Sequence, residues 1–181
     1  MRLLAPSAAL LSAALLAATP ALATLAPGAR APDFTARGAQ AGKPFTVNLQ
    51  AALKRGPVVL YFFPAAFTGG CNAEAHAFAE AIPDFQRAGA TVIGMTAGNV
   101  EQLEDFSSKM CAGKFAVAAA SPAVVQGYDV VLRKPDGSAA KVTSRTSYVI
   151  GRDGRIAFVH DDMSPAEHVQ LTLAAVRKLH R

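Results

Sequence analysis

Residues 57–63 read PVVLYFF, and residues 64–71 continue as PAAFTGGC. The first segment is an unbroken run of β-branched and aromatic side chains with the length of a strand. A strand without alternating polar positions is buried on both faces, as in the middle of a sheet that helices cover. Pro64 ends this run, Gly69-Gly70 indicates a turn, and helix-forming residues follow from 73 to 87. The stretch therefore predicts a buried strand that leads through a glycine turn into a helix, with a cysteine at the bend.

The rest of the chain alternates between segments typical of strands and of helices. Residues 25–44 are rich in Gly, Pro and Ala and predict an extended segment that ends in a hairpin through 43–49. The later strands are expected at 90–95, 115–118, 130–132, 147–150 and 156–159, and the later helices at 100–110, 121–128 and 165–180. Pro83 is expected to kink or restart the helix that contains it. The alternation predicts an α/β domain with a mostly parallel sheet, covered on both faces, and a late antiparallel hairpin.

Composition excludes several classes of function. The chain has 181 residues and a formal net charge of +5, without any run of five basic residues, so we expect no nucleic-acid partner. The two cysteines, Cys71 and Cys111, are too few for a disulfide scaffold, an iron–sulfur cluster or a four-cysteine zinc site. The four histidines lack a companion metal-binding motif. We therefore expect neither a metal site nor another cofactor.

Residues 1–23 have the pattern of a cleavable signal peptide. Arg2 supplies a positive charge, residues 3–18 are mostly apolar, and Ala21-Leu22-Ala23 places small residues where a signal peptidase cleaves. A retained membrane anchor is the alternative, but the apolar run is shorter than the ~20 residues that span a bilayer. We predict a mature domain of residues 24–181, periplasmic or secreted, without stable membrane association. A cysteine pair can persist as a disulfide in that compartment.

The sequence around Cys71 favours a reactive thiol. At the start of a helix, free backbone N–H groups and the positive end of the helix dipole stabilise a thiolate. Gly69-Gly70 allows these N–H groups to approach a small substrate, and the Thr68 hydroxyl can donate a hydrogen bond to a sulfur anion. Pro64 fixes the backbone and can shield the site from water. A purely structural cysteine is the alternative, although such cysteines usually lie inside strands or helices.

These residues carry a resemblance to a known family. Pro64-Ala-Ala-Phe-Thr68-Gly-Gly-Cys71 resembles the P-x-x-x-T-x-x-C signature of the peroxiredoxins, and residues 58–95 look like their Q-type, bacterioferritin-comigratory class. The similarity resumes at 144–150 and 153–156 and covers nearly all of the mature chain. It implies a thioredoxin-like fold with a central mixed sheet covered by helices on both faces. It also implies a thiol peroxidase for small peroxides, reduced by a thioredoxin-like or other thiol donor. Q-type members are often monomers, so by analogy we expect a monomer.

The same resemblance implies the roles of the site residues. Cys71 would be the nucleophile that attacks a peroxide and becomes a sulfenic acid. Thr68 would hydrogen-bond the thiolate and the peroxide, and Pro64 would limit access of solvent. Arg145 matches the family's distant arginine, which would hold Cys71 as an anion and stabilise the leaving oxygen. Glu74 matches a glutamate that many members carry, and it is a candidate to support Arg145.

The sequence departs from the family at the second cysteine. Many Q-type members place a resolving cysteine five residues after the nucleophile, where this chain has His76. Other members carry the resolving cysteine on the following helix, where this chain has Cys111. The resemblance thus implies an intramolecular Cys71–Cys111 disulfide. The alternatives are that Cys111 is a bystander or that an outside thiol resolves Cys71.

Two other functional classes remain open from the sequence. One is a thiol–disulfide oxidoreductase that acts on proteins, although Cys71-Asn-Ala-Glu74 lacks the second cysteine of a C-x-x-C motif. The other is an exported domain without enzymatic activity, in which a Cys71–Cys111 bridge is only structural.

Overall fold

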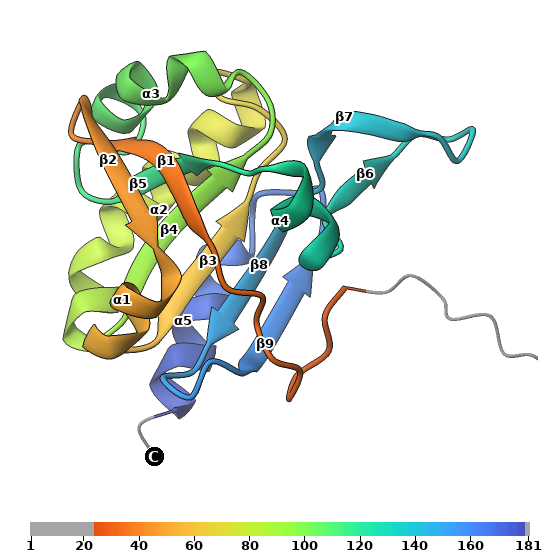
Figure 1. Cartoon of the computed structure of the whole chain (residues 1–181). Helices are drawn as coiled ribbons and strands as arrows, with labels where there is room; N and C mark the ends of the chain where they lie inside the picture. Colours follow the sequence, from red (N-terminus) through yellow and green to blue (C-terminus); the bar gives the residue numbers. More distant parts are fainter. Residues whose placement is uncertain (1–23, 180–181) are drawn as a thin grey trace, which may run out of the picture.

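The computed structural model describes residues 24–179 and has a seven-stranded sheet in the order β2-β1-β5-β4-β3-β8-β9 (Figure 1). Its strands are β1 (Thr35–Gln40), β2 (Lys43–Asn48), β3 (Val58–Phe62), β4 (Thr91–Thr96), β5 (Ala116–Ala119), β8 (Thr146–Ile150) and β9 (Ile156–Asp161). A separate two-stranded sheet pairs β6 (Val131–Arg133) with β7 (Ala139–Thr143). The helices are α1 (Leu49–Arg55), α2 (Gly69–Arg87), the 3₁₀ helix η1 (Val100–Gln102), α3 (Leu103–Lys109), α4 (Pro122–Gly127) and α5 (His168–Lys178). The predicted signal peptide, residues 1–23, lies outside the described residues.

Residues 58–62 form β3, an interior strand of the sheet. All five residues of β3 are buried, and β3 pairs in parallel with β4 and antiparallel with β8. The prediction of a buried, two-faced strand is confirmed. The prediction of a mostly parallel sheet is wrong, because only the β3–β4 and β4–β5 pairs are parallel. Both edges of the sheet are hairpins, β1–β2 and β8–β9, and strands joined by tight turns run antiparallel.

Helices cover both faces of the sheet, as expected (Figure 1). On one face α1 and α4 bury Leu49, Leu53 and Val124 against the sheet. On the other face α2, α3 and α5 bury a second apolar cluster, which includes Phe78, Phe106 and Val176. Burial of apolar area on both faces is the main stabilising contribution. The second cluster also contains Cys71 and Cys111, so both thiols lie on this face of the sheet.

Helix α2 begins earlier than predicted and continues past Pro83 without a restart. It begins at Gly69, so the glycine pair belongs to its first turn. Pro83 lies inside the helix and does not restart it. A proline removes the hydrogen bond to the carbonyl four residues earlier, which here belongs to Ala79. Lys114 Nζ donates to that carbonyl at 3.0 Å, and this replacement bond explains how the helix continues past the proline.

Two elements of the structure, α1 and β7, are not predicted from the sequence. Helix α1 is capped by Asn48, whose side chain accepts from the backbone N–H of Ala51. Strand β7 pairs with β6 in a hairpin that extends away from the main sheet (Figure 1). Helix α5 begins at His168 and not at 165. Within residues 24–179, no helix combines the length and apolar character needed to cross a membrane.

Candidate active site around Cys71

The loop between β3 and α2 is held by side chains from several elements. The four consecutive backbone carbonyls of residues 63–66 each accept a hydrogen bond from a side chain. The donors, in order, are Thr143, Thr96, Thr68 and Asn99, at 2.7, 2.9, 3.1 and 2.9 Å. Buried carbonyls without partners would be costly, so these bonds fix the path of the loop. They therefore determine where α2 begins.

Cys71 is the third residue of α2 and its side chain is buried. Phe67, just before the helix, has a left-handed backbone with φ 59°, which is uncommon for a non-glycine residue. The backbone N–H of Asn72 donates to the Thr68 carbonyl at 2.8 Å, so the first turn is closed around the cysteine. The prediction that Cys71 lies in the first turn of a helix is confirmed. The sulfur lies at the end of the helix where the backbone dipoles favour negative charge.

Arg145 lies beside that sulfur. Its Nη2 is 3.6 Å from Cys71 Sγ, and its side chain is buried, coming from the segment just before β8. Arg145 Nε donates to the Met163 carbonyl at 2.9 Å, and Nη1 donates to Glu74 Oε2. The sequence alone does not show that Arg145 lies near Cys71, and the structure places the two side chains in contact. Three separate contacts fix the plane of the guanidinium group against the sulfur.

Gly70 makes room for this contact. A Cβ at Gly70 would lie 3.2 Å from Arg145 Nη2, whereas a Cβ at Gly69 would meet no atom within 4 Å. The first distance is tighter than ordinary van der Waals contact. A side chain at Gly70 would therefore displace the guanidinium group, while one at Gly69 would not.

Glu74 is fully buried one turn after Cys71 and forms an ion pair with Arg145. Burial raises the pKa of Glu74 to about 7, although the neighbouring Arg145 cation opposes this rise. The second carboxyl oxygen, Oε1, lies 3.7 Å from His168 Nδ1. The proposed link between Glu74 and Arg145 is thus present as a contact.

Thr68 and Pro64 lie on the outer side of the site. Thr68 is exposed, and its hydroxyl donates to the Ala65 carbonyl at 3.1 Å. Its oxygen keeps lone pairs that can accept from a ligand. Pro64 is half-buried, and its carbonyl accepts from Thr96. His76, at the position of the alternative resolving cysteine, is an exposed residue of α2.

Cys111 lies two residues after the end of α3 and is fully buried as a free thiol. Its backbone N–H donates to the Phe106 carbonyl at 3.2 Å, and its carbonyl accepts from Lys114 at 3.0 Å. Burial raises the pKa of the Cys111 thiol far above its ordinary value. The next residue, Ala112, has φ 49°, a left-handed conformation that is strained for a residue with a Cβ.

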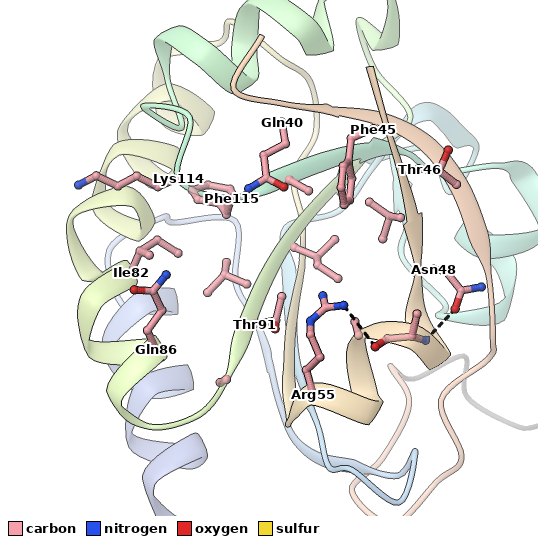
Figure 2. Close-up of a pocket in the computed structure, with 17 residues that line it drawn as sticks. Gln40, Phe45, Thr46, Asn48, Arg55, Ile82, Gln86, Thr91, Lys114 and Phe115 are labelled. Atoms are coloured by element: carbon pink, nitrogen blue, oxygen red, sulfur yellow. Dashed lines mark hydrogen bonds between the residues drawn. The ribbon is translucent and has the colours of Figure 1, made fainter. Parts of the chain in front are cut away.

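A pocket of about 270 Å³ lies elsewhere, between α1, β2 and the second half of α2 (Figure 2). Its lining includes Phe45, Arg55, Ile82 and Lys114, and none of the five predicted site residues. Figure 2 shows these side chains around the pocket, and no cysteine is among its lining residues. The pocket is therefore separate from the buried Cys71–Arg145 pair, which is the candidate active site.

Comparison with known proteins identifies the family. A model of the AhpC/TSA family matches residues 27–159. The chain belongs to this family, the peroxiredoxins. Chloroplastic peroxiredoxin Q from Arabidopsis thaliana is 31% identical over 147 residues, which are 81% of this chain and 64% of that protein. Peroxiredoxin Bcp from Xanthomonas campestris is 26% identical over 121 residues, 66% of this chain and 76% of that protein.

Solved structures agree with the assignment to the peroxiredoxins. Peroxidoxin BcpB from Mycobacterium tuberculosis has a TM-score of 0.71 at 28% identity, and the match covers 84% of this chain and 97% of that one. Xanthomonas campestris peroxiredoxin Q has a TM-score of 0.69 at 22% identity, covering 80% of this chain and 91% of that one, and supports the fold alone. The thioredoxin-like fold and the Q-type, bacterioferritin-comigratory resemblance are confirmed. The expectation that this peroxiredoxin is a thiol peroxidase is also confirmed.

Two residues near the site had no signal strong enough to be singled out from the sequence. His168 was among four histidines without a motif, yet it is fully buried and contacts Glu74. The sequence predicts Ser147 only as a strand residue, yet its hydroxyl bonds His168 Nδ1 at 2.8 Å. Only the packing of α5 against β8 brings these side chains behind Arg145.

Proposed function

We propose that this peroxiredoxin is an exported enzyme that reduces hydrogen peroxide and organic hydroperoxides through a sulfenic acid on Cys71. The observation that carries the proposal is the buried contact of 3.6 Å between Arg145 Nη2 and Cys71 Sγ at the start of a helix. A permanent cation and the helix terminus together favour the thiolate, which is the reactive form. The first turn of α2 is otherwise open to a ligand through the exposed Thr68 and Gly69.

In the first step the Cys71 thiolate attacks the terminal oxygen of the peroxide. The O–O bond breaks, an S–O bond forms, and the sulfur is oxidised by two electrons to a sulfenic acid. The other peroxide oxygen leaves as an alkoxide or hydroxide, takes a proton and departs as alcohol or water. Arg145 is the cation beside this reaction, and it stabilises negative charge as that charge moves from sulfur to oxygen.

In the second step Cys111 resolves the sulfenic acid. Its thiol attacks the Cys71 sulfur, water leaves, and an intramolecular disulfide forms. A disulfide requires a sulfur–sulfur distance of about 2.05 Å, so at least one of the two free cysteines has to move. Burial keeps the Cys111 thiol protonated and a poor nucleophile, and exposure would activate it. The strained backbone at Ala112 favours opening of the chain at this point.

In the third step two electrons from a thiol donor restore both cysteines. Thiol–disulfide exchange passes through a mixed disulfide with the donor and ends with the donor oxidised. A thioredoxin-like protein is the donor that the family implies, and the enzyme acts as a monomer by the same analogy. The signal-like sequence at 1–23 supports export to the periplasm or outside the cell, where the donor has to be an exported thiol protein.

Donor-coupled consumption of hydrogen peroxide by the wild type and by Cys71→Ser and Cys111→Ser variants tests the proposal. Cys71→Ser should consume no peroxide. Cys111→Ser should complete one oxidation per chain and then stop until a small thiol is added. A Cys71→Ser variant that turns over peroxide at the wild-type rate would refute the assignment of the nucleophile. Continued protein-donor turnover by Cys111→Ser would refute its resolving role.

Export is tested separately by fractionation of cells that express the full chain. The mature protein should appear in the periplasm or the medium with an N-terminus at residue 24. A product that stays in the cytoplasm with residues 1–23 attached would refute export and leave the chemistry at Cys71 unaffected.

A further inference from the structure

Two hydrogen-bond acceptors fix the guanidinium group of Arg145, and His168 lies next to both of them. The acceptors are the Met163 carbonyl, which binds Nε, and Glu74 Oε2, which binds Nη1. His168, in the first turn of α5, is fully buried behind both. Its ring contacts the Asp162 carbonyl, next to Met163, and the carboxyl group of Glu74.

The first link runs through the segment that carries Met163. His168 Nε2 bonds the Asp162 carbonyl at 2.9 Å. The Asp162 backbone N–H in turn donates to the Arg145 carbonyl at 3.2 Å. His168 therefore anchors the peptide next to the carbonyl that receives Arg145 Nε. Without the hydrogen bond from His168, the Met163 carbonyl would lie in an exposed loop after β9.

The second link runs through Glu74. A carbonyl oxygen only accepts, so the hydrogen bond to Asp162 places the ring proton on Nε2 and leaves Nδ1 as an acceptor. Ser147 Oγ fills that acceptor position at 2.8 Å. Glu74 Oε1 lies 3.7 Å from Nδ1 and has no hydrogen-bond partner within residues 24–179. The carboxyl group of Glu74 therefore packs against the His168 ring.

The ring is neutral in this position. Burial lowers the pKa of His168 to about 4, and the neighbouring His160 ring, 4.5 Å away, and Arg145 act in the same direction. The hydrogen bond to the Asp162 carbonyl and the Asp162 charge oppose them. A neutral imidazole adds no second cation beside Arg145, and its contribution is geometric.

We propose that His168, oriented by Ser147, is a positioning residue that holds Arg145 against Cys71 through Glu74 and the Met163 carbonyl. The inference rests on the proposed peroxidase chemistry of Cys71, in which Arg145 has to lie beside the reacting sulfur. A displacement of a catalytic group by about 1 Å can lower a rate by 10²-fold, so loss of the ring should be visible in the oxidation step.

The test compares His168→Leu with His168→Gln in the full chain. The readout is the second-order rate constant for oxidation of reduced protein by hydrogen peroxide, measured by competition with a second peroxidase. His168→Leu removes both contacts and should lower the constant at least ~10-fold. His168→Gln keeps an N–H that can reach the Asp162 carbonyl and should recover part of the loss. Thr172→Val, which removes the buried hydroxyl that bonds the His168 carbonyl, is the control for damage to α5 alone.

A double-mutant cycle with Arg145→Lys separates positioning from general destabilisation. If His168 acts through the guanidinium group, His168→Leu should lower the rate constant less than ~3-fold when Lys replaces Arg145. Equal losses in both backgrounds, or a wild-type constant in His168→Leu, would overturn the proposal. If His168→Leu fails to fold, Ser147→Ala replaces it in the cycle, with an expected loss of ~3- to 10-fold and the same criteria. A wild-type protein inert to peroxide would instead refute the proposed function itself.

Discussion

Arg145 Nη2 lies 3.6 Å from Cys71 Sγ although 74 positions separate the two residues in the chain. Both side chains are buried, so solvent and salt screen their interaction less than they would at the surface. The guanidinium group cannot lose its proton, and its other nitrogens are occupied by Glu74 and the Met163 carbonyl. The arrangement presents a fixed positive charge to a sulfur at the start of a helix.

Substitution of Arg145 by lysine should separate charge from geometry. Lysine keeps the positive charge but has one nitrogen in place of the planar fork that makes three contacts. We expect the rate constant for oxidation by hydrogen peroxide to fall by about 10²-fold, the usual effect of losing one preorganised donor. Stopped-flow or competition kinetics on the reduced protein measures this. A rate constant within ~3-fold of the wild type would contradict the role given to the guanidinium group.

The glycine pair before Cys71 provides a matched test of the same contact. Gly70→Ala places a methyl group 3.2 Å from Arg145 Nη2, whereas Gly69→Ala meets nothing within 4 Å. We expect Gly70→Ala to lower the peroxide rate constant by about 10-fold and Gly69→Ala to leave it unchanged. Equal rate constants in the two variants would show that the guanidinium group tolerates displacement.

The buried Glu74 and His168 should give opposite contributions to stability as the pH changes. The pKa of Glu74 is raised from 4.5 to about 7 in the folded state, so its contribution is present below pH 4.5 and lost as the pH rises through 7. The pKa of His168 is lowered from 6.5 to about 4, so its contribution is present above pH 6.5 and lost as the pH falls through 4. Between pH 4.5 and 6.5 the two slopes oppose each other.

Replacing either Glu74 or His168 should reveal how the free energy of unfolding depends on pH through the other residue. Glu74→Gln should lose stability as the pH falls from 6.5 to 4, and His168→Gln should lose stability as the pH rises from 4.5 to 7. Each change should be on the order of 3 kcal/mol, since one pKa unit corresponds to about 1.4 kcal/mol. Urea unfolding at several pH values measures the free energy of unfolding. Parallel pH profiles in the wild type and both variants would contradict this account.

The strained residue after Cys111 offers a test of the resolving step. Ala112→Gly relieves a φ of 49° and should stabilise the reduced protein by about 1 kcal/mol. Cys111 has to leave its buried position to reach Cys71, so the same change should slow disulfide formation by about 5-fold. Asp129→Gly relieves a similar φ of 50° beyond α4 and is the control. Mass spectrometry of quenched samples follows the linked peptide, and faster disulfide formation in Ala112→Gly would contradict the proposed opening.

The buried strand β3 and the position of Cys71 in the first turn of α2 could be predicted from local sequence. The apolar run before Pro64 gave the correct strand, and the helix formers after Cys71 gave the correct helix, although this helix already begins at Gly69. The contact of Arg145 with Cys71 depends on the antiparallel pairing of β8 with β3, which no local pattern encodes. The family resemblance was needed to single out Arg145.

Other features could not be predicted from the sequence, and each has an identifiable physical reason. Strand β7 packs outside the main sheet and alternates between exposed and half-buried residues, so it lacked the apolar run that marked the buried strands. Pro83 remained inside α2 because Lys114 supplies the missing hydrogen bond to Ala79. His168 became a contact of Glu74 only through the packing of α5. The behaviour of Pro83 and the contact of His168 both depend on side chains that are far apart in the sequence.

The central claim is that Cys71 is the atom that peroxide oxidises, and trapping of the sulfenic acid tests it most directly. The Cys111→Ser variant is reduced, treated with one equivalent of hydrogen peroxide in the presence of dimedone, digested and analysed by mass spectrometry. We predict a stoichiometric dimedone adduct on the peptide that contains Cys71. A Cys71 thiol that remains free and unmodified after the peroxide is added would contradict the account.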